Sequence, residues 1–387
     1  MAKGVLRSVW QGVEACAGSI RRTFPHNAIL YGVAIAMLGA TQVFLSYYKL
    51  TVSLKAVPIL LNMAGIWILL WIVVLPAIDL LHFWRNGAPR GVIFLIGRRM
   101  AARLFESDRI GNAIHAFVIL IPLIIAFGAL KEDIAIVHPF AWDTTFTQWD
   151  RVLGMGRMPW EILQPFLGVP AITIAINFCY DVWLLVMFIV LLWQVFSVSL
   201  QALRLQFLLS FILIWFFGGS VLAMIFSSAG PCFYDYLFPG GSPYTAQMAY
   251  LHGIGGDWIW SLTVQDDLWR TYTTGVGDIR GISAMPSMHV GIAVLLAIFG
   301  WRKSHRLGFA LSAFAAIILV GSVHLAWHYA VDGLAAIVIA FACWATAGAM
   351  TRRWLEFLEG RRASRPYIAV LPERDAPQGA AVLRQFQ

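Results

Sequence analysis

The sequence predicts an all-α polytopic membrane bundle. Of its 387 residues, 60% are hydrophobic and only 12% are charged, and the mean hydropathy is +0.74. That composition lies far outside the range of soluble globular proteins. Several uninterrupted apolar stretches reach about 20 residues, the length of a helix that crosses ~30 Å of hydrocarbon. They are rich in Leu, Ile, Ala and Phe and do not alternate with polar residues, which excludes a transmembrane β-barrel.

About eight transmembrane helices are expected. The predicted spans are 27–48, 57–81, 111–130, 170–197, 206–228, 287–301, 307–325 and 329–350. Trp and Tyr residues lie near the ends of these spans, as expected for side chains at the membrane interface. The N-terminal segment 1–26 is basic and amphipathic but has no apolar core of signal-peptide length, so the first span is expected to act as its own anchor.

The distribution of basic residues predicts the orientation. Lys and Arg gather in the N-terminal segment, in the connectors after the second and sixth spans, and in the tail, and Arg204 lies on the same side, between the fourth and fifth spans. The other side carries only Lys49, Lys55, Lys131, Arg151, Arg157, Arg270 and Arg280. Because basic loops stay in the cytoplasm, both termini are expected there, in a plasma (inner) membrane protein. This topology explains the net charge of +8, so nucleic-acid binding is not expected.

Four regions follow from these spans. Residues 1–26 form the cytoplasmic N-terminus, 27–110 hold two accessory transmembrane helices and a basic interfacial segment, 111–350 hold the six remaining spans, and 351–387 form a cytoplasmic tail. Within the third region, the connectors 131–169 and 229–286 are long and lie on the side opposite the termini. A functional site is therefore expected on the periplasmic or extracytoplasmic side.

Three ionisable residues converge at the outer ends of the last three spans. The topology places His289, His328 and Asp332 at one depth, where charged groups are costly and usually serve a function. If His328 and Asp332, four residues apart, share a helical face, the carboxylate can accept one imidazole N–H and leave the other nitrogen free. That nitrogen could attack phosphorus while His289 supplies a proton to the leaving oxygen.

The sixth span begins with residues suited to an anion site. Pro286 favours a first helical turn, and Ser287 can cap it. The free backbone N–H groups at such a helix start would point towards an anion. Ser287 is therefore predicted to contribute to a phosphate-binding site.

Two motifs carry a resemblance to a known family. Pro286-Ser287-Met288-His289 and His328-Tyr329-Ala330-Val331-Asp332 resemble the second and third signature motifs of the type 2 phosphatidic acid phosphatase superfamily. The residues of the two motifs are most similar to those of the inositolphosphotransferase branch, which includes inositol phosphorylceramide synthases. They resemble those of sphingomyelin synthases more loosely. The resemblance covers roughly residues 220–335 and implies a six-helix core formed by spans three to eight.

That resemblance implies a role for each motif residue. His328 would be the nucleophile that forms a phosphohistidine, Asp332 would orient it, and His289 would act as general acid and then base. The resemblance implies neither a metal nor another cofactor.

The family's cations are missing from this chain. If Pro231 is the proline of the first motif, Lys-x6-Arg-Pro, the Lys and Arg positions hold Ala223 and Gly230. The Ser-Arg pair that opens the third motif falls on Gly321 and Ser322. Another donor must then neutralise the phosphate. The first candidate is Arg280 and the second is Arg270, although each could equally be a solvated loop charge.

Further polar residues leave alternatives open. His324 could contact substrate or phosphate, form a hydrogen bond at the interface, or join His328 and Asp332 in a metal site. Asp181 could bind a polyol acceptor, pair with Arg280, or be purely structural. The pair Asp143 and Asp150 either shapes an outer vestibule or belongs to a solvated loop.

The favoured function is that of an integral-membrane lipid phosphotransferase. Through a phosphohistidine, it would move a phospho-headgroup resembling inositol phosphate from a phospholipid donor to a lipid alcohol such as ceramide. With water as acceptor, the same chemistry gives a phosphatase acting on phosphatidate or polyprenyl (di)phosphate. A non-catalytic transporter or scaffold would use the same residues as a polar lining. The expected partners are membrane lipids, and no oligomeric state is predicted.

Overall fold

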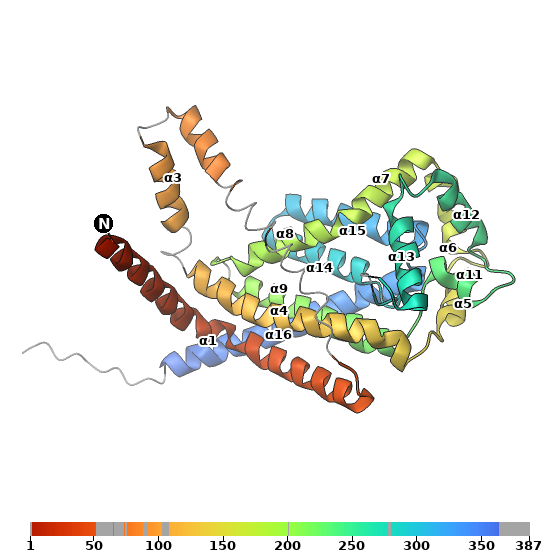
Figure 1. Ribbon diagram of the computed structural model, residues 1–387, viewed down its shortest axis with the longest axis horizontal. Coiled ribbons are helices and arrows are strands. Elements are labelled where there is room, and N and C mark those ends of the chain that lie inside the picture. The colour runs from red at the N-terminus through yellow and green to blue at the C-terminus, as the bar shows by residue number, and fades with distance from the viewer. Residues whose placement is uncertain are drawn as a thin grey trace, which may run out of the picture.

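The chain folds into long helices that run side by side, with most of the short helices gathered at one end and α3 near the other (Figure 1). The computed structural model describes residues 2–51, 76–87, 91–102, 108–199, 201–277 and 280–363, together with the single positions 65 and 73. Across these residues every regular element is helical and none is a strand. The predicted all-α fold class is confirmed.

Several of the described helices have the length and composition of membrane spans. Six are long and apolar enough to cross a membrane: Gly12–Tyr48, Arg109–Val137, Pro170–Val195, Gln201–Ile225, His305–His324 and Ala330–Arg361. The predicted sixth span corresponds to α14 (Met288–Lys303), which has only 16 residues. Most of the second predicted span, 57–81, lies outside the described residues. The chain is thus a polytopic membrane protein.

The first helix is longer than the sequence suggested. It runs as α1 (Ala2–Tyr48) and includes Pro25, so much of the N-terminal segment 1–26 continues the span that follows it. Its early turns are too polar for a hydropathy criterion to recognise as part of a span. Along α1 packs α4 (Arg109–Val137), and the basic connector contains a separate helix, α3 (Val92–Ala101).

Two of the predicted spans are interrupted. The fourth span consists of α7 (Pro170–Asp181) and α8 (Trp183–Val195), which meet at Val182. The fifth comprises α9 (Gln201–Leu213), the π-helical segment η2 (Ile214–Leu222) and α10 (Ala223–Ile225). The last two spans are α15 (His305–His324) and α16 (Ala330–Ala363).

Both long connectors fold into helices, whereas the sequence was interpreted as loops there. We call α5, α6, α11, α12 and α13 the cap. Its helices are α5 (Asp143–Leu153), α6 (Pro159–Leu167), α11 (Tyr234–Leu237), α12 (Thr245–Ile254) and α13 (Trp260–Thr274), and a short 3-10 turn, η3 (Pro231–Phe233), precedes α11. Figure 1 places the cap at the end opposite the one where α1 begins and α16 ends.

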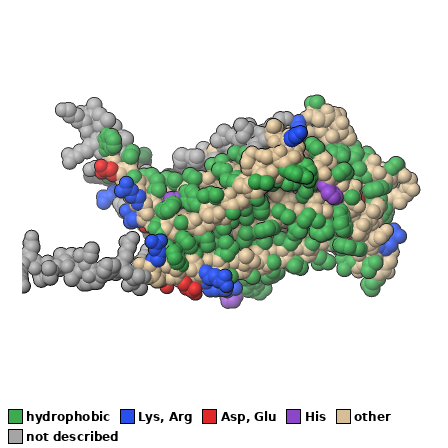
Figure 2. Space-filling model, turned by 90° about the horizontal axis from the view of Figure 1, so that it is seen from below, with side chains coloured by type: hydrophobic (Ala, Val, Ile, Leu, Met, Phe, Trp, Pro, Cys, Tyr) green, Lys and Arg blue, Asp and Glu red, His purple; other side chains and the backbone are tan. Residues whose placement is uncertain are grey.

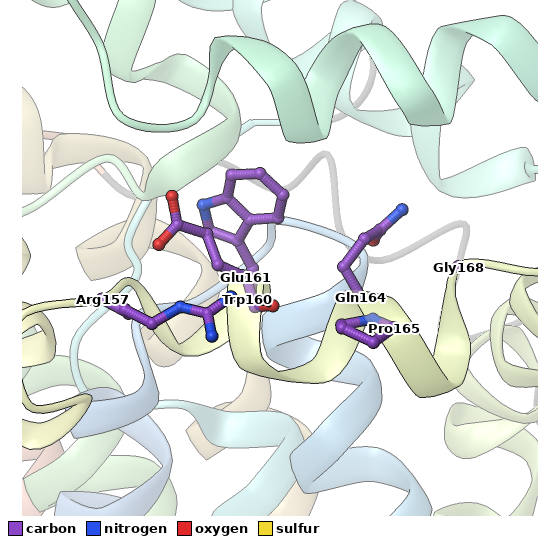
Figure 3. A pocket seen from close by; sticks show the side chains of 6 residues that line it. All are labelled: Arg157, Trp160, Glu161, Gln164, Pro165 and Gly168. Atoms are coloured by element: carbon purple, nitrogen blue, oxygen red, sulfur yellow. Dashed lines mark hydrogen bonds between the residues drawn. The ribbon is translucent and has the colours of Figure 1, made fainter.

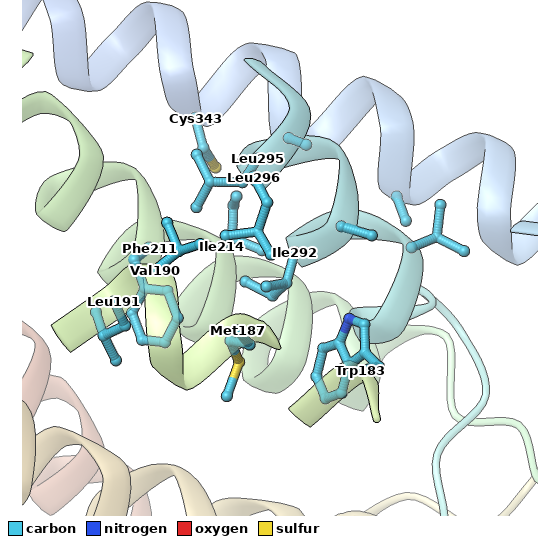
Figure 4. Packing of buried hydrophobic residues seen from close by; sticks show 14 of the residues in the cluster. Trp183, Met187, Val190, Leu191, Phe211, Ile214, Ile292, Leu295, Leu296 and Cys343 are labelled. Atoms are coloured by element: carbon cyan, nitrogen blue, oxygen red, sulfur yellow. The ribbon is translucent and has the colours of Figure 1, made fainter. Parts of the chain in front are cut away.

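The core surrounds the short helix α14. Its residues Ile292, Leu295 and Leu296 are fully buried and pack between α8, α9 and α16, as Figure 4 shows. Because lipid tails are as apolar as these side chains, their burial stabilises the fold mainly through van der Waals packing between the helices. Apolar side chains also cover much of the face that Figure 2 shows, where most of the visible Lys and Arg gather towards the end at which α1 begins.

One cation predicted to lie in a cytoplasmic connector is instead buried. Arg204 is 0% exposed and donates to Gln194 O at 3.0 Å, Asn27 Oδ1 at 2.8 Å and Asn112 O at 2.9 Å. The planar guanidinium offers donors in fixed directions, which allows it to join oxygens from several helices. Arg204 therefore ties together α1, α4, α8 and α9, and it lies within α9, not in a connector.

Candidate active site

Two histidines distant in sequence lie side by side at the cap end of the bundle. His289 is the second residue of α14, and His328 lies in the turn between α15 and α16. Their ring centroids are 5.7 Å apart with an interplanar angle of 62°. The sequence predicted this convergence of the two imidazoles.

Hydrogen bonding fixes the orientation of His328. Its Nδ1 lies 2.8 Å from the carbonyl oxygen of Ala284 and 3.4 Å from Asp332 Oδ2. A carbonyl oxygen can only accept, so Nδ1 carries the hydrogen and Nε2 keeps its lone pair. The sequence attributed this orientation to a shared helical face, and that interpretation was wrong. His328 precedes α16, and Asp332 lies in the first turn, where its Oδ2 also accepts the Tyr329 backbone N–H at 2.9 Å.

The environment of His328 favours the neutral imidazole. The side chain is only 6% exposed, and burial lowers its pKa to about 3. The hydrogen bond to Ala284 raises the pKa, and the positive charge of Lys131 lowers it. At neutral pH the ring is therefore uncharged, which is the form that can act as a nucleophile.

Aromatic rings hold His289 in place. Tyr180, at the end of α7, stacks on its imidazole with centroids 4.5 Å apart, and the ring of Trp183, at the start of α8, also lies 4.5 Å away. The break between α7 and α8 places these two rings on the same imidazole. The sequence offered a signal for this contact, because a Tyr-Asp-Val-Trp run interrupts an otherwise apolar span.

Ser287 links the beginnings of two helices. It is the N-cap of α14, with its Oγ accepting the Val290 N–H at 3.4 Å, and its own N–H donates to Asp332 O at 3.3 Å. The predicted N-cap of this helix is therefore present. Pro286, which the sequence placed in the first turn, instead precedes the N-cap residue Ser287, and the peptide bond before Pro286 is cis.

Asp143 is a buried anchor of the site, not a residue of a solvated loop. It is 0% exposed and accepts hydrogen bonds from Ala229 N at 3.0 Å, Gly230 N at 2.9 Å and Tyr329 Oη at 2.8 Å. Burial raises the pKa of its carboxyl group, while these hydrogen bonds lower it. Asp143 thus connects α5 to the residue that follows His328.

Asp150 performs a similar task at the start of α16. Its two oxygens accept from Ala330 N at 2.8 Å and Val331 N at 3.0 Å. A carboxylate at this position satisfies free N–H groups and complements the helix dipole. Burial raises the pKa of Asp150 to about 7. The signal missed in the sequence is the seven-residue interval from Asp143 to Asp150, which places both carboxylates on one face of an amphipathic helix.

The cap also supports the turn that carries His328. Gln247 on α12 donates to Val323 O at 2.7 Å, and Gln265 on α13 donates to Leu325 O at 3.0 Å. These bonds satisfy carbonyl groups at the end of α15. The conformation of the histidine turn therefore depends on helices that belong to neither signature motif.

At two positions where the resembled motifs carry polar side chains, this chain has glycines that lie close to neighbouring atoms. Gly230 has φ +107, and a Cβ atom there would lie 2.8 Å from Trp327 O. At Gly321 a Cβ would lie 2.9 Å from Ile176 Cγ2 and 3.4 Å from the ring of Tyr180. There is no room for the larger side chains at these positions.

The two arginine candidates have local partners. Arg280 Nη2 donates to Gly275 O at 2.8 Å, and its Nε is buried without a hydrogen-bond partner. Arg270 pairs with Asp267 at 2.8 Å, and its side chain is 64% exposed. Their predicted contact with phosphate stays a prediction.

His324 and Asp181 also have defined partners. His324 is 1% exposed, with its Nε2 2.9 Å from Thr173 Oγ1, which joins α15 to α7. Asp181 accepts from Asn177 Nδ2 at 2.6 Å, and no ion pair with Arg280 forms within the described part of the chain. Their substrate contacts likewise stay predictions. Among the described residues, no group of three His, Cys, Asp or Glu is arranged to hold a metal ion.

A separate surface hollow lies along α6 (Figure 3). It has a volume of about 460 Å³, is open to the outside, and is lined by Arg157, Trp160, Glu161, Gln164, Pro165 and Gly168. None of these residues belongs to the predicted site. The candidate catalytic centre is the histidine pair, whose ring centroids are 5.7 Å apart.

A comparison with protein families places this geometry in context. The model of the PAP2 superfamily matches residues 144–346, just over half of the chain, and the matched segment contains His289, His328 and Asp332. No curated protein and no solved structure is significantly similar to the chain. The chain therefore belongs to the PAP2 superfamily and is a membrane enzyme of the lipid phosphatase or phosphotransferase type.

Proposed function

We propose that this enzyme is a lipid phosphotransferase that works through a phosphohistidine. It takes a phospho-headgroup of the inositol phosphate type from a phospholipid and delivers it to a lipid alcohol such as ceramide. The observation that carries the proposal is the histidine pair. The hydrogen bond from His328 Nδ1 to Ala284 O leaves Nε2 of His328 free, and the ring centres of His328 and His289 are 5.7 Å apart. The resemblance of the residues in the two motifs to the inositolphosphotransferase branch supports the choice of headgroup.

The first half-reaction transfers the headgroup phosphate to the enzyme. Nε2 of His328 attacks phosphorus, and the bond between phosphorus and the diacylglycerol oxygen breaks. His289, as the imidazolium, gives its proton to that oxygen. A phosphate anion bound beside His289 favours this charged form. Asp332, 3.4 Å from Nδ1, stabilises the positive charge that develops on His328.

The second half-reaction releases the product and restores both histidines. His289, now neutral, takes the proton of the acceptor hydroxyl, whose oxygen attacks phosphorus. The bond between phosphorus and Nε2 breaks, and its electrons return to the imidazole. Ser287 and the free N–H groups at the start of α14 bind the phosphate oxygens. Arg280, Arg270, His324 and Asp181 are proposed as further substrate contacts.

The site is proposed to face the periplasm or another extracytoplasmic space, with both termini in the cytoplasm of a plasma membrane protein. Basic side chains gather at the end where α1 begins, and the cap lies at the opposite end (Figures 1 and 2). This distribution supports the proposed orientation. An impermeant thiol reagent should label Asp257→Cys, an exposed residue between α12 and α13, in intact cells, and Lys303→Cys only after lysis. The reverse pattern would refute the orientation.

Product analysis tests the reaction. Full-length protein purified in detergent is incubated in EDTA with headgroup-labelled phosphatidylinositol, with and without ceramide. The proposal predicts a labelled sphingolipid that requires ceramide and forms without added metal. Water-soluble label as the sole product, whether or not ceramide is present, would identify water as the acceptor. Phosphatidate and a polyprenyl diphosphate would then be tested as substrates of a phosphatase.

A further inference from the structure

We propose that Lys131 supplies the positive charge of the phosphate site, and that this single cation selects a phosphodiester monoanion over a phosphomonoester dianion. The inference rests on the proposed function and names the charge class of its lipid donor. It assigns a role to a residue of α4 that lies before the segment 144–346 matched by the family.

The backbone before the second motif packs directly on Lys131. Gly281 has φ +84, and a Cβ atom there would lie 2.6 Å from Lys131 Cγ and 2.8 Å from Lys131 O. A glycine is required because this close approach leaves no space for a side chain. The half-buried lysine stem is thereby held against the segment that leads into Pro286 and Ser287.

Packing also connects Lys131 to the start of α14. Its Nζ lies 5.9 Å from the ring centre of Phe127, one turn earlier on α4. A Cβ at Gly219 would lie 2.7 Å from Phe127 Cε2 and 3.3 Å from Met288 Sδ, so both side chains meet at this glycine of η2. Met288 directly precedes His289. The contacts of Phe127 and Met288 at Gly219 thus bring this end of α4 to the residue before His289, and the positive charge of Lys131 lowers the pKa of His328.

The ammonium of Lys131 has no hydrogen-bond or ion-pair partner in the described part of the chain. No carboxylate there lies within ion-pair distance of Lys131, although Glu132 and Asp133 follow it in sequence. A part-buried cation without a counter-charge is costly, and such residues are usually functional. Arg280, the alternative cation, instead uses Nη2 to bind Gly275 O. A bound phosphate would offset the cost of burying Lys131.

The count of charges around the histidines argues for a monoanion. Ala223, Gly230 and Ser322 are uncharged where the resembled motifs carry cations. The donors near the histidines are instead neutral. Tyr180 Oη, Trp183 Nε1 and Trp327 Nε1 are buried without hydrogen-bond partners, and the rings of the first two contact His289.

The Asp332 carboxylate offsets the charge of the His289 imidazolium, so the ammonium of Lys131 leaves one net positive charge. With several neutral donors beside it, this charge matches the single negative charge of a phosphodiester. A phosphomonoester carries about 1.5 to 2 negative charges at pH 7, and the second charge would be left uncompensated away from water. The site therefore favours a diester phospholipid as donor and disfavours phosphatidate.

Ligand binding tests this inference separately from catalysis. Full-length His328→Gln protein in detergent is titrated at pH 8 with dihexanoyl phosphatidylmethanol, a diester, or with dihexanoyl phosphatidate, a monoester with the same tails. Calorimetry should give a Kd for the diester at least about tenfold lower than for the monoester. Lys131→Met should weaken diester binding at least about tenfold, Lys131→Arg should retain it, and the exposed control Lys49→Met should leave it unchanged.

Each outcome has a distinct meaning. An unchanged Kd in Lys131→Met would overturn the assignment of Lys131 whatever reaction the enzyme catalyses. Tighter binding of the monoester, or no binding of either lipid, would overturn the charge argument. Binding that depends on Lys131, in a chain whose unsubstituted form transfers no headgroup, would leave the inference standing and refute the proposed function alone.

Discussion

Tyr329 Oη donates a 2.8 Å hydrogen bond to Asp143 Oδ1, joining two fully buried residues that are 186 positions apart. Tyr329 follows His328, and Asp143 opens the cap helix α5. The same carboxylate holds the N–H groups of Ala229 and Gly230. The position of the histidine turn is therefore set by α5 as well as by the helices that carry the motifs.

Removing the Asp143 carboxylate should destabilise the protein and lower its activity. Asp143→Ala leaves two backbone N–H groups and the Tyr329 hydroxyl unpaired, at a cost of roughly 1–3 kcal/mol each. We expect the apparent Tm in detergent to fall by at least about 5 °C. The exposed control Asp257→Ala should melt like the unsubstituted chain. Equal Tm values for both variants would show that Asp143 is not an anchor.

Gly230 should tolerate a side chain less well than a glycine of the same backbone conformation. Gly230→Ala combines an unfavourable φ of +107 with a Cβ only 2.8 Å from Trp327 O. At Gly240 φ is +108, and no atom lies within 4 Å of the position that a Cβ would take, so Gly240→Ala carries the backbone cost alone. We expect Gly230→Ala to lose more thermal stability and more activity. Matching losses would contradict the close approach.

Asp150 should make stability depend on pH. Its pKa is about 7 when folded and near 3.8 when unfolded, so the folded state binds more protons between about pH 4 and 7. This contribution lowers the free energy of unfolding as pH rises through that window. Asp150→Asn should abolish it, giving a more positive slope of stability against pH than the unsubstituted chain.

His328 contributes a slope of opposite sign, because its folded pKa of about 3 lies below the ordinary value. Comparing the unsubstituted chain with Asp150→Asn cancels that contribution, since both proteins contain His328. Thermal unfolding at several pH values supplies the measurement, with the exposed Asp257→Asn as control. Parallel slopes for the unsubstituted chain and Asp150→Asn would exclude the raised pKa.

The stacked ring of Tyr180 should matter for catalysis more than its hydroxyl group. Tyr180→Phe keeps the ring 4.5 Å from His289, whereas Tyr180→Ala removes it and lets the imidazole rotate. A misplaced general acid typically costs about 10²-fold in rate. We expect kcat to fall by that order in the Ala variant and by less than about tenfold in the Phe variant. Similar losses in both would assign the effect to the hydroxyl group.

The sequence was sufficient to predict the bundle and the histidine pair. Long apolar stretches can satisfy their backbone only as helices in a membrane, and the topology then brings the ends of distant spans to one depth. That reasoning placed His289 beside His328 although the two residues are 39 positions apart in the printed sequence.

The supporting residues could not be obtained in that way. Asp143, Asp150 and Gln247 act through hydrogen bonds between segments that no local pattern relates, and their helices are too short and polar to register as spans. The burial of Arg204 could not be predicted for a similar reason, because its oxygen acceptors come from helices far apart in the sequence. Even the His328 contact with Ala284 depends on tertiary packing.

The most direct test is to trap the covalent intermediate. Protein mixed with phosphorus-labelled phosphatidylinositol in the absence of an alcohol acceptor is denatured rapidly, and the labelled peptide is identified by mass spectrometry. We expect an acid-labile, base-stable label on His328, discharged by later addition of ceramide, and none in His328→Gln. Full turnover by His328→Gln, or a label on another residue, would contradict the assignment of His328 as the nucleophile.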